Sequence, residues 1–531
     1  MTSRQLAFAF AVAALIAVAA IQHATRIAGV ERVSHDDTIS YLAATGHQGE
    51  FAEVVETRSA PVAQWVPASQ WQRFTRVEQA FPFVTIAQDL GHYDIHPPAY
   101  FWLLHVWVLL VGVHLWSGPV LNVLVHVLTG VVLWRLARHV TKSPRAAWGA
   151  VGVWATLPAV AQTVVSTRQY SLAALFSIAL ASAFIRTRES ASTRGLIGVA
   201  ALTALGMLTL YPFGLVVACL GLFCAADLID AARRRTALMQ LGAMAAGGVV
   251  FLLCQPWLRE ALQRQQEQVE IPSPALSRLR VDVLLYDLPR FAIGELPALA
   301  GIAVLIVTAV LAVLAWRARP QARPVIAVAV VVPVALSAAY VAVLTPGAAS
   351  QARYFALALP HVALLPVLAW PYLKARPVLF VAAAVLVAAT VINTMLAVSE
   401  ASTPPATTLD GDRPVVMDNL ARGVLLRILW DAPPSTPVYA ADQRTLLSTT
   451  DRWLHCEDPS PCHERPLTLA TQVQYEATAE GQIQILDAAA DVRVVTPEPS
   501  LDDLAQRYLL SAPTGSVAGT SSATGVIHAG R

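Results

Sequence analysis

The sequence predicts an α-helical protein that crosses a membrane about a dozen times. Of its 531 residues, 56% are hydrophobic and only 14% are charged, whereas soluble domains carry about 25% charged residues. Such a chain cannot bury its apolar surface in one aqueous core, so lipid must surround much of it. Neither the net charge of +2 nor any basic tract indicates a nucleic-acid partner.

The second observation is the spacing of the apolar segments. A span needs about 20 apolar residues, and we expect about 11 to 13 spans. Because Arg4 precedes it, the first segment could be a signal peptide, but the many later segments favour an uncleaved span. The predicted spans are Leu6–Ile21, Pro98–Trp116, Val120–Trp134, Ala146–Val165, Ser171–Ile185, Leu196–Leu210, Phe213–Ala226, Leu241–Leu253, Leu299–Trp316, Val325–Leu344, Phe355–Trp370 and Val378–Val398.

Basic residues in short loops predict the orientation, because such loops stay in the cytoplasm. This rule leaves the tail after Ser399 outside. One conflict arises: with the N-terminus inside, two full spans after the outer loop Gln22–His96 would put Arg135 outside. One of these segments is then re-entrant, or the N-terminus is outside, or Arg135–Arg145 breaks the charge rule. The basic loops are Arg135–Arg145, Arg186–Arg194, Arg233–Arg235, Arg317–Arg323 and Lys374–Arg376.

Three large regions are expected outside the bilayer and define the domains. Residues 1–399 form the transmembrane module, which includes the first outer loop, 22–96, and a second outer loop, Gln255–Pro297. The first loop carries aromatic residues that suit helices lying in the membrane interface. Residues 400–512 are expected to form a small extracytoplasmic α/β domain, and the polar residues 513–531 a disordered tail. The aromatic residues are Trp65, Trp71, Phe74, Phe81 and Phe83.

The C-terminal α/β domain is predicted from short patterns. They indicate a helix at Asn419–Trp430, strands at Val438–Ala441 and Val492–Val495, and a hairpin at Val473–Leu486 around Glu480-Gly481.

Two cysteines, Cys456 and Cys462, lie in this domain. In an oxidising compartment such a pair forms a disulfide by default. The flanking His455 and His463 raise a zinc site as an alternative, but the cysteine spacing does not match the usual one. We therefore expect the disulfide.

Two polar clusters carry the candidate chemistry. The first, Ser34–Tyr41, contains Asp36 and Asp37, and the second, His92–Tyr100, contains Asp94 and His96. Carboxylates near a membrane surface can act as a general base or hold a cation that binds phosphate. The alternative is a solvated loop, in which Asp36 caps a helix and Pro97-Pro98 begins another.

These clusters resemble motifs of the GT-C glycosyltransferases, in particular the bacterial relatives of protein O-mannosyltransferases and aminoarabinose transferases. The resemblance covers roughly Leu6 to Val398, and the order of its short motifs is more specific than any one of them. The matching motifs are the acidic pair followed by Tyr41, Asp94-x-His96-Pro97-Pro98-x-Tyr100, Arg168-x-Tyr170-x-Leu172, Leu208–Gly214, Pro256-Trp257-Leu258 and Arg353-Tyr354.

The resemblance implies an inverting transfer of a sugar from a polyprenyl-phosphate donor to a cell-envelope lipid, glycan or protein outside the cytoplasm. Asp36 stands where the family has its catalytic Asp, and Asp37 where it usually has Glu. Arg168 and Arg353 are candidates for the donor phosphate, because guanidinium groups bind phosphate oxygens bidentately; the alternative is snorkelling to the interface. Metal dependence stays open. The other expected substrate-binding residues are Tyr41, Asp94, His96, Tyr170 and Tyr354.

Two other classes of protein remain as alternatives. A transporter or flippase would place ionisable groups or broken helices near the midplane of the bilayer. The main polar residues of the spans are His105, Asn122, His126 and His361, which more often pack helices together. A sensor that works through its tail would need one span rather than a dozen.

Overall fold

The structure is a computed structural model that describes most of the chain, in two compact units. Unit 1 comprises Met1–Ala52 and Phe74–Pro405, and unit 2 comprises Glu53–Arg73 and Ala406–Arg531. The described residues are 3–30, 33–269, 298–343, 352–373, 392, 395, 414–448, 467–472, 494–502 and 505–511.

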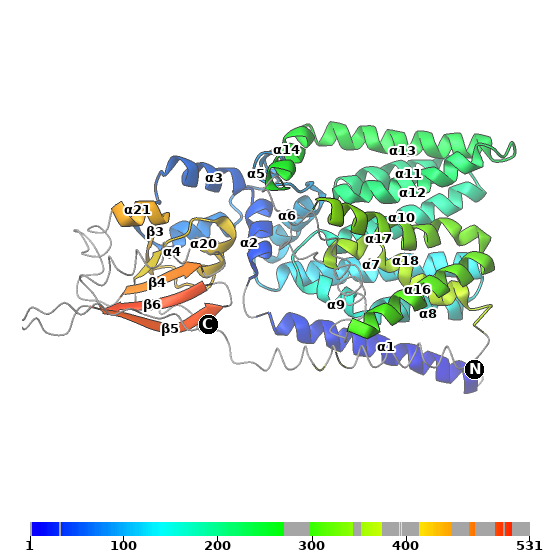
Figure 1. Cartoon of the computed structure of the whole chain (residues 1–531), viewed down its shortest axis with the longest axis horizontal. Coiled ribbons are helices and arrows are strands. Elements are labelled where there is room, and N and C mark those ends of the chain that lie inside the picture. Colours follow the sequence, from blue (N-terminus) through cyan, green and yellow to red (C-terminus); the bar gives the residue numbers. More distant parts are fainter. Residues whose placement is uncertain are drawn as a thin grey trace, which may run out of the picture. The chain divides into compact units, whose positions relative to one another are not determined.

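Unit 1 is a bundle of helices (Figure 1). Its core is a continuous cluster of buried apolar side chains from α7, α8, α10, α12, α17 and α18. The helices with their bounds are α1 (Ser3–Ala28), α2 (His35–Ala44), α3 (Gln48–Thr57, which continues into unit 2), α5 (Phe83–Tyr93), α6 (Ala99–Val111), α7 (Ser117–Thr141), α8 (Pro144–Thr156), α9 (Pro158–Val165), α10 (Tyr170–Glu189), α11 (Thr193–Met207), η2 (Tyr211–Phe213), α12 (Gly214–Asp227), α13 (Arg234–Cys254), α14 (Leu258–Val269), α16 (Ala298–Ala318), η5 (Pro320–Ala322), α17 (Arg323–Val343), η6 (Ala352–Leu357) and α18 (Leu359–Ala369).

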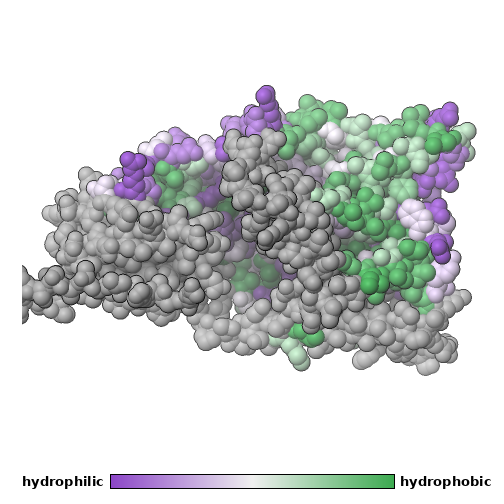
Figure 2. Space-filling view, viewed as in Figure 1, coloured by the Kyte–Doolittle hydropathy of each residue, from purple (hydrophilic) through white to green (hydrophobic). Residues whose placement is uncertain are grey.

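Several of these helices are long and apolar enough to cross a membrane. Within the described residues, four pass by length and hydropathy: Ser117–Thr141, Tyr170–Glu189, Arg234–Cys254 and Pro320–Ala338. Hydrophobic side chains cover much of the visible surface of the bundle, and hydrophilic ones gather at its ends (Figure 2). The predicted polytopic α-helical fold is thereby confirmed, although the last predicted span, Val378–Val398, lies almost wholly outside the described residues.

The segment predicted as a full span at Pro98–Trp116 is shorter than expected. Helix α6 has 13 residues and ends at Gly112, whose φ of +81° favours glycine. At 1.5 Å per residue, it is too short to cross a hydrocarbon core about 30 Å thick. Helices α11 and α12, with 15 and 14 residues, are also short, and a re-entrant α6 stays one of the three resolutions that the charge pattern allowed.

The segment predicted as one span at Ala146–Val165 is broken. Helices α8 and α9 are apolar enough to cross together, but they are bent by 55° at their junction. The break falls at Leu157, which has an extended conformation before Pro158, as a residue preceding proline prefers. The predicted span is therefore either one broken span or a re-entrant loop.

The polar residues of the helices mostly hold the bundle together. The side-chain amide of Asn122 donates to the carbonyl of Ser166 (2.5 Å) and that of Val164 (3.2 Å). Nδ1 of His105 lies 2.7 Å from the carbonyl of Ala44, and Nε2 of His361 lies 2.8 Å from the hydroxyl of Ser177. These three polar side chains therefore join neighbouring segments of the bundle, as expected for groups that pack helices together.

Unit 2 contains a six-stranded sheet with the order β1-β3-β2-β4-β6-β5. Its central pairs, β2 with β3 and β2 with β4, are parallel, and the outer pairs are antiparallel. The strands with their bounds are β1 (Trp65–Pro67), β2 (Val415–Met417), β3 (Pro437–Ala440), β4 (Leu467–Gln472), β5 (Val494–Asp502) and β6 (Ala505–Ser511), and the helices are α4 (Ala68–Gln72), α20 (Arg422–Ile428) and α21 (Gln443–Ser448), with the short turn η1 at Arg73–Thr75.

Strand β1 comes from the first outer loop and not from the tail. Trp65 pairs with Tyr439 across the β1–β3 ladder, and the side chain of Gln72 donates to the carbonyls of Leu429 and Ala432. Trp71 and Phe74 are fully buried. The expectation that the aromatic residues of this loop lie in helices at the membrane interface was therefore wrong for Trp71 and Phe74, which are buried in the protein, and for Trp65, which lies in a strand.

Parts of the tail that carry predictions lie outside the described residues. They include Cys456 and Cys462, the hairpin Val473–Leu486, and residues 513–531. The disulfide, the hairpin and the disorder of the last residues stay predictions.

Candidate active site

The acidic pair lies in the first turn of α2. Ser34 precedes the helix in an extended conformation, and its hydroxyl accepts a hydrogen bond from the backbone N–H of Asp37 (3.1 Å). This is the geometry of an N-cap. Because Ser34 caps the helix, Asp36 does not, and its carboxylate is free to make contacts outside α2.

Asp36 forms ion pairs with two arginines that are distant in sequence. Its Oδ1 lies 3.4 Å from a terminal nitrogen of Arg168, and its Oδ2 accepts a hydrogen bond from Arg353. The guanidinium carbon of Arg353 also lies 5.5 Å from the ring centre of Tyr170, within range of a cation–π interaction. We call Asp36, Arg168 and Arg353 the ion cluster. The sequence had predicted each of them, and the structure brings them together.

The cluster is partly open to solvent. The side chains of Asp36 and Arg353 are 24% and 23% exposed, whereas that of Arg168 is 7% exposed. Burial alone would raise the pKa of Asp36, but the hydrogen bond with His35 and the charges of Arg168 and Arg353 outweigh it and hold that pKa well below its ordinary value. Asp36 is therefore ionised at neutral pH.

Asp37 has a different environment from that of its neighbour. It is 7% exposed, and its Oδ1 accepts a hydrogen bond from the backbone N–H of Thr167 (2.6 Å). Burial raises its pKa despite the hydrogen bonds from Ser34 and Thr167. This carboxylate ties α2 to the turn that precedes α10, so Asp36 is the more accessible of the two.

The turn before α10 is positioned by a close approach of α7. A Cβ atom at Gly118 would lie 2.2 Å from the side chain of Thr167, so only glycine fits there. The backbone N–H of Gly118 donates to the hydroxyl of Tyr41 (2.8 Å), which itself donates to the carbonyl of His114 (2.9 Å). Arg168 is thereby held beside α2, where it also donates to the hydroxyl of Ser40 (3.3 Å).

Tyr41 was expected to bind substrate, but its contacts are structural. It is 1% exposed, and its hydroxyl is engaged as both donor and acceptor within the protein. A role in substrate binding would require these contacts to break.

Asp94 and His96 form a second polar pair at the start of the α6 segment. Nδ1 of His96 lies 2.6 Å from Oδ1 of Asp94, and the same oxygen accepts a hydrogen bond from the N–H of Ile95 (2.7 Å). Burial raises the pKa of Tyr211 to about 12, and the charge of Asp94 adds to this rise. The pair therefore lies near the turn η2, which joins α11 to α12.

The chain is similar to a known protein family and to solved membrane-protein structures. A family model described as dolichyl-phosphate-mannose-protein mannosyltransferase matches residues 95–259. The crystal structure of ArnT from Cupriavidus metallidurans in the apo state is similar with a TM-score of 0.51 and 14% identity, covering 95% of this chain and 100% of that one. The chain is thus similar to this family over residues 95–259, and it has the fold of ArnT, a polytopic membrane protein.

A second structure of ArnT from the same organism gives a similar match. ArnT bound to undecaprenyl phosphate matches this chain with a TM-score of 0.52 and 15% identity, covering 96% of this chain and 99% of that one. No curated protein sequence is similar enough to match. At these identities the solved structures establish the GT-C fold, and the roles of the site residues rest on the geometry above.

Sequence reasoning missed some residues that hold the candidate site together. Ser40 holds Arg168, Thr167 holds Asp37, and His35 contacts Asp36 at 3.3 Å. The position of Ser40 four residues after Asp36, on the same face of a helix, was an available signal. Tyr170 lies beneath Arg353, where the prediction had it binding substrate. The side chain of Tyr354 is outside the described part of the structure.

No metal site is formed by the described residues, among which no three His, Cys, Asp or Glu side chains lie close enough to hold an ion. We derive no step of the reaction through a metal.

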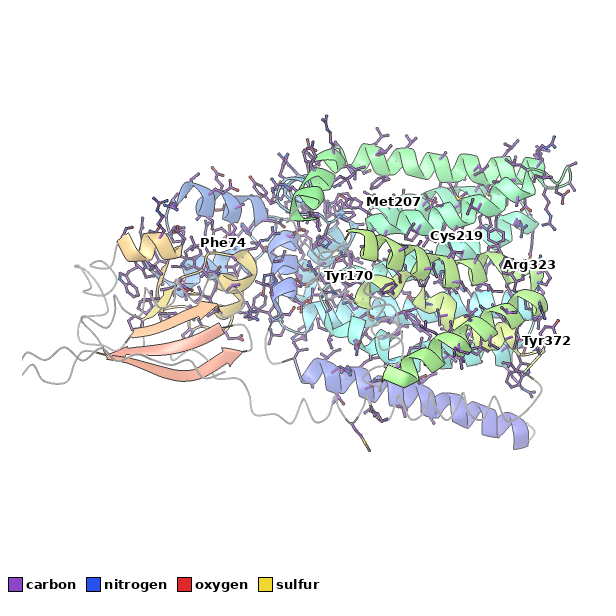
Figure 3. All side chains as sticks on the ribbon, in the orientation of Figure 1. Phe74, Tyr170, Met207, Cys219, Arg323 and Tyr372 are labelled. Atoms are coloured by element: carbon purple, nitrogen blue, oxygen red, sulfur yellow. The ribbon has the colours of Figure 1, made fainter. Side chains whose placement is uncertain are left out.

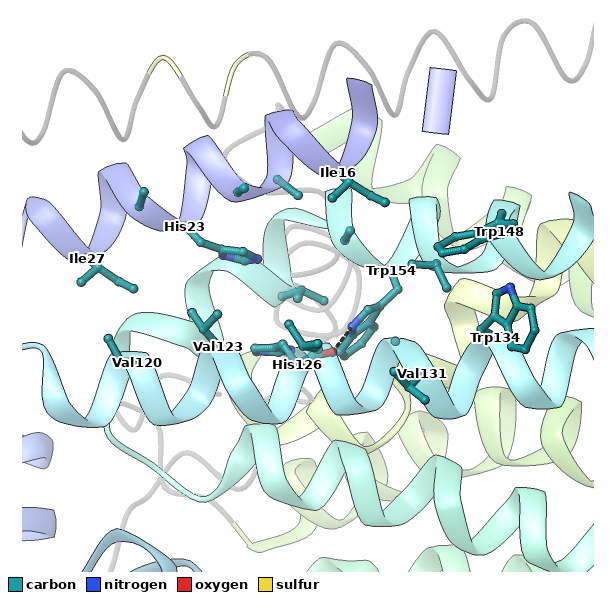
Figure 4. Close-up of a pocket in the computed structure, with 18 residues that line it drawn as sticks. Ile16, His23, Ile27, Val120, Val123, His126, Val131, Trp134, Trp148 and Trp154 are labelled. Atoms are coloured by element: carbon teal, nitrogen blue, oxygen red, sulfur yellow. Dashed lines mark hydrogen bonds between the residues drawn. The ribbon is translucent and has the colours of Figure 1, made fainter. Parts of the chain in front are cut away.

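A large cavity lies between α1, α7, α8 and α9 (Figure 4). Its volume is about 760 Å³, within the range of ligand-binding pockets. His23 and His126 are its polar residues, stacked with ring centres 6.2 Å apart. A wall this apolar suits a hydrocarbon chain better than a sugar.

Proposed function

We propose that the chain transfers a sugar from a polyprenyl-phosphate-linked donor to an acceptor outside the cytoplasm, with inversion at the anomeric carbon. The acceptor is a lipid, glycan or protein of the cell envelope. The observation that supports this function is the ion cluster, which unites one accessible carboxylate with two guanidinium groups in the GT-C fold.

The chemistry needs one base and support for the leaving group. Asp36 takes the proton from an acceptor hydroxyl as it attacks the anomeric carbon. Arg353 and Arg168 neutralise the departing lipid phosphate, which is a good leaving group and needs no strong acid. Because Asp37 is held by Thr167 and Ser34, the cluster offers one accessible carboxylate, which fits a single displacement with inversion.

Incubation of membranes that contain the protein with labelled polyprenyl-phosphate sugars tests this function. We expect the label to leave the lipid and to appear on an acceptor. A transporter or flippase would instead move the labelled lipid across the bilayer with its sugar still attached. If no donor of this class loses its sugar, while the labelled lipid crosses the membrane, the alternative function stands.

The orientation of the bundle is part of the proposal. With α6 re-entrant, a cytoplasmic N-terminus and a cytoplasmic Arg135–Arg145 no longer conflict. Tyr170, next to the ion cluster, and Arg323, in a basic loop, lie toward opposite ends of the bundle (Figure 3). The positive-inside rule then puts the ion cluster outside the cytoplasm.

A reporter fusion after Ser399 checks this orientation. We expect a phosphatase that is active only outside the cytoplasm to be active there, because one span follows the basic loop Lys374–Arg376. A reporter that works only in the cytoplasm should be silent at the same position. The opposite pattern would contradict both the orientation and an outer active site.

A further inference from the structure

The proposed role of Asp36 as a general base conflicts with its ion pairs in the structure. A general base has to be free to take a proton, and a group with a lower pKa is a weaker base. In the structure, however, the carboxylate is bonded to Arg353 and Arg168, and these contacts hold its pKa low. As it stands in the structure, Asp36 is therefore ionised but weakly basic.

The two guanidinium groups are held by other contacts as well. Arg353 lies over the ring of Tyr170, and Arg168 donates to the hydroxyl of Ser40. Neither contact involves the carboxylate of Asp36. Nε of Arg168 is buried with no hydrogen-bond partner among the described residues, so this side chain has a donor to spare. Both cations would stay in place if the carboxylate left them.

A phosphate group competes directly for such a pair of cations. Guanidinium groups bind phosphate and carboxylate through the same planar arrangement of N–H donors. Two arginines against one aspartate leave the ion cluster with one positive charge, which attracts an anion. The anion that the proposed function brings to this place is the phosphate of the donor.

We infer that the donor phosphate replaces the Asp36 carboxylate on Arg353 and Arg168, so that Asp36 becomes a free base only when the donor is bound. This inference rests on the proposed function and adds an order of events to it. The exchange makes and breaks hydrogen bonds only, and no covalent bond changes. Once the guanidinium charges face phosphate, the pKa of Asp36 rises, and the carboxylate gains basicity beside the anomeric carbon.

The exchange predicts that removing the charge of Asp36 strengthens donor binding. Purified wild-type protein and Asp36→Asn are compared for binding of undecaprenyl phosphate in detergent, with undecaprenol as the control without phosphate. We expect Asp36→Asn to bind the phosphate lipid about tenfold or more tightly than wild type, because a charged hydrogen-bonding competitor is gone. Binding of undecaprenol should be equal in the two proteins.

Two further variants separate exchange from a general change in charge. Asp89→Asn removes one negative charge from α5 of the same outer region. The carboxylate of Asp89 accepts a hydrogen bond from the N–H of Gly49 (2.8 Å), and no arginine among the described residues pairs with it. This substitution should leave binding of the phosphate lipid unchanged. In the Arg353→Ala background the gain from Asp36→Asn should shrink, because the two side chains act on each other.

The outcomes distinguish this inference from the proposed function. If wild type prefers undecaprenyl phosphate to undecaprenol but Asp36→Asn binds it equally or more weakly, the exchange is overturned and the donor site stands. An equal gain in Asp89→Asn also overturns the exchange, since bulk charge then explains it. If neither protein prefers the phosphate lipid, the donor class of the proposed function fails, and the exchange fails with it.

Discussion

Asp36→Asn should lower the rate of sugar transfer at least about a hundredfold, the scale typical of a lost general base. Asn is close to Asp in size and can still accept a hydrogen bond from Arg353 through its carbonyl, but it cannot take a proton at neutral pH. The measurement is turnover of the labelled donor by purified protein under single-turnover conditions with saturating donor, so that a change in donor affinity does not enter.

The Asn variant should insert and fold as wild type does. Ser34, and not Asp36, caps α2, so the substitution leaves the start of the helix intact. Near-wild-type turnover by folded Asp36→Asn would rule out Asp36 as the base. Asp37→Asn and Asp94→Asn would then be the variants to measure.

Arg353→Ala should weaken use of the donor by about tenfold to a hundredfold, the range for a lost hydrogen bond to a charged group. Arg353→Lys should have a smaller effect, since Lys keeps the charge but loses the bidentate fork. The measurement is the donor concentration at half-maximal rate together with the maximal rate. A rise in the former shows that the phosphate contact exists before the transition state.

Arg323→Ala is the matched control for this series. Arg323 is also an interfacial arginine against an aromatic ring, 5.2 Å from the ring centre of Trp316, but it lies toward the end of the bundle away from Tyr170 (Figure 3). Its removal should leave donor use unchanged. If Arg353→Ala and Arg353→Lys also behave as wild type, the phosphate contact does not exist.

Much of the transmembrane module could be predicted from the sequence because hydrophobic segments about 20 residues long are a strong local signal. The long helices α7, α10 and α13 fall at predicted spans. The members of the ion cluster could be singled out because Asp36, Arg168 and Arg353 stand in motifs whose order resembles a known family. What the motifs could not give was that all three residues meet.

Two missed features have local signals, because α6 ends at Gly112 and the break at Leu157 precedes Pro158. Other parts depend on distant contacts. The structural role of Tyr41 depends on Gly118 and His114, which are more than 70 residues away in sequence. The pairing of β1 with β3 joins the first outer loop to the tail, and local periodicity carries no information about such a partner.

Because β1 is synthesised long before β3, with which it pairs, the sheet can form only late in synthesis. Gln72 bonds to Leu429, 357 residues later, and a ribosome adds about 5–20 residues per second. The loop with Trp65 and Trp71 therefore waits roughly 20–70 s for its partner strand while the spans between them insert. Its buried aromatic surface stays uncovered for that time, which makes it a natural place for a chaperone to bind. A chain truncated after the last span would leave this loop permanently without its sheet.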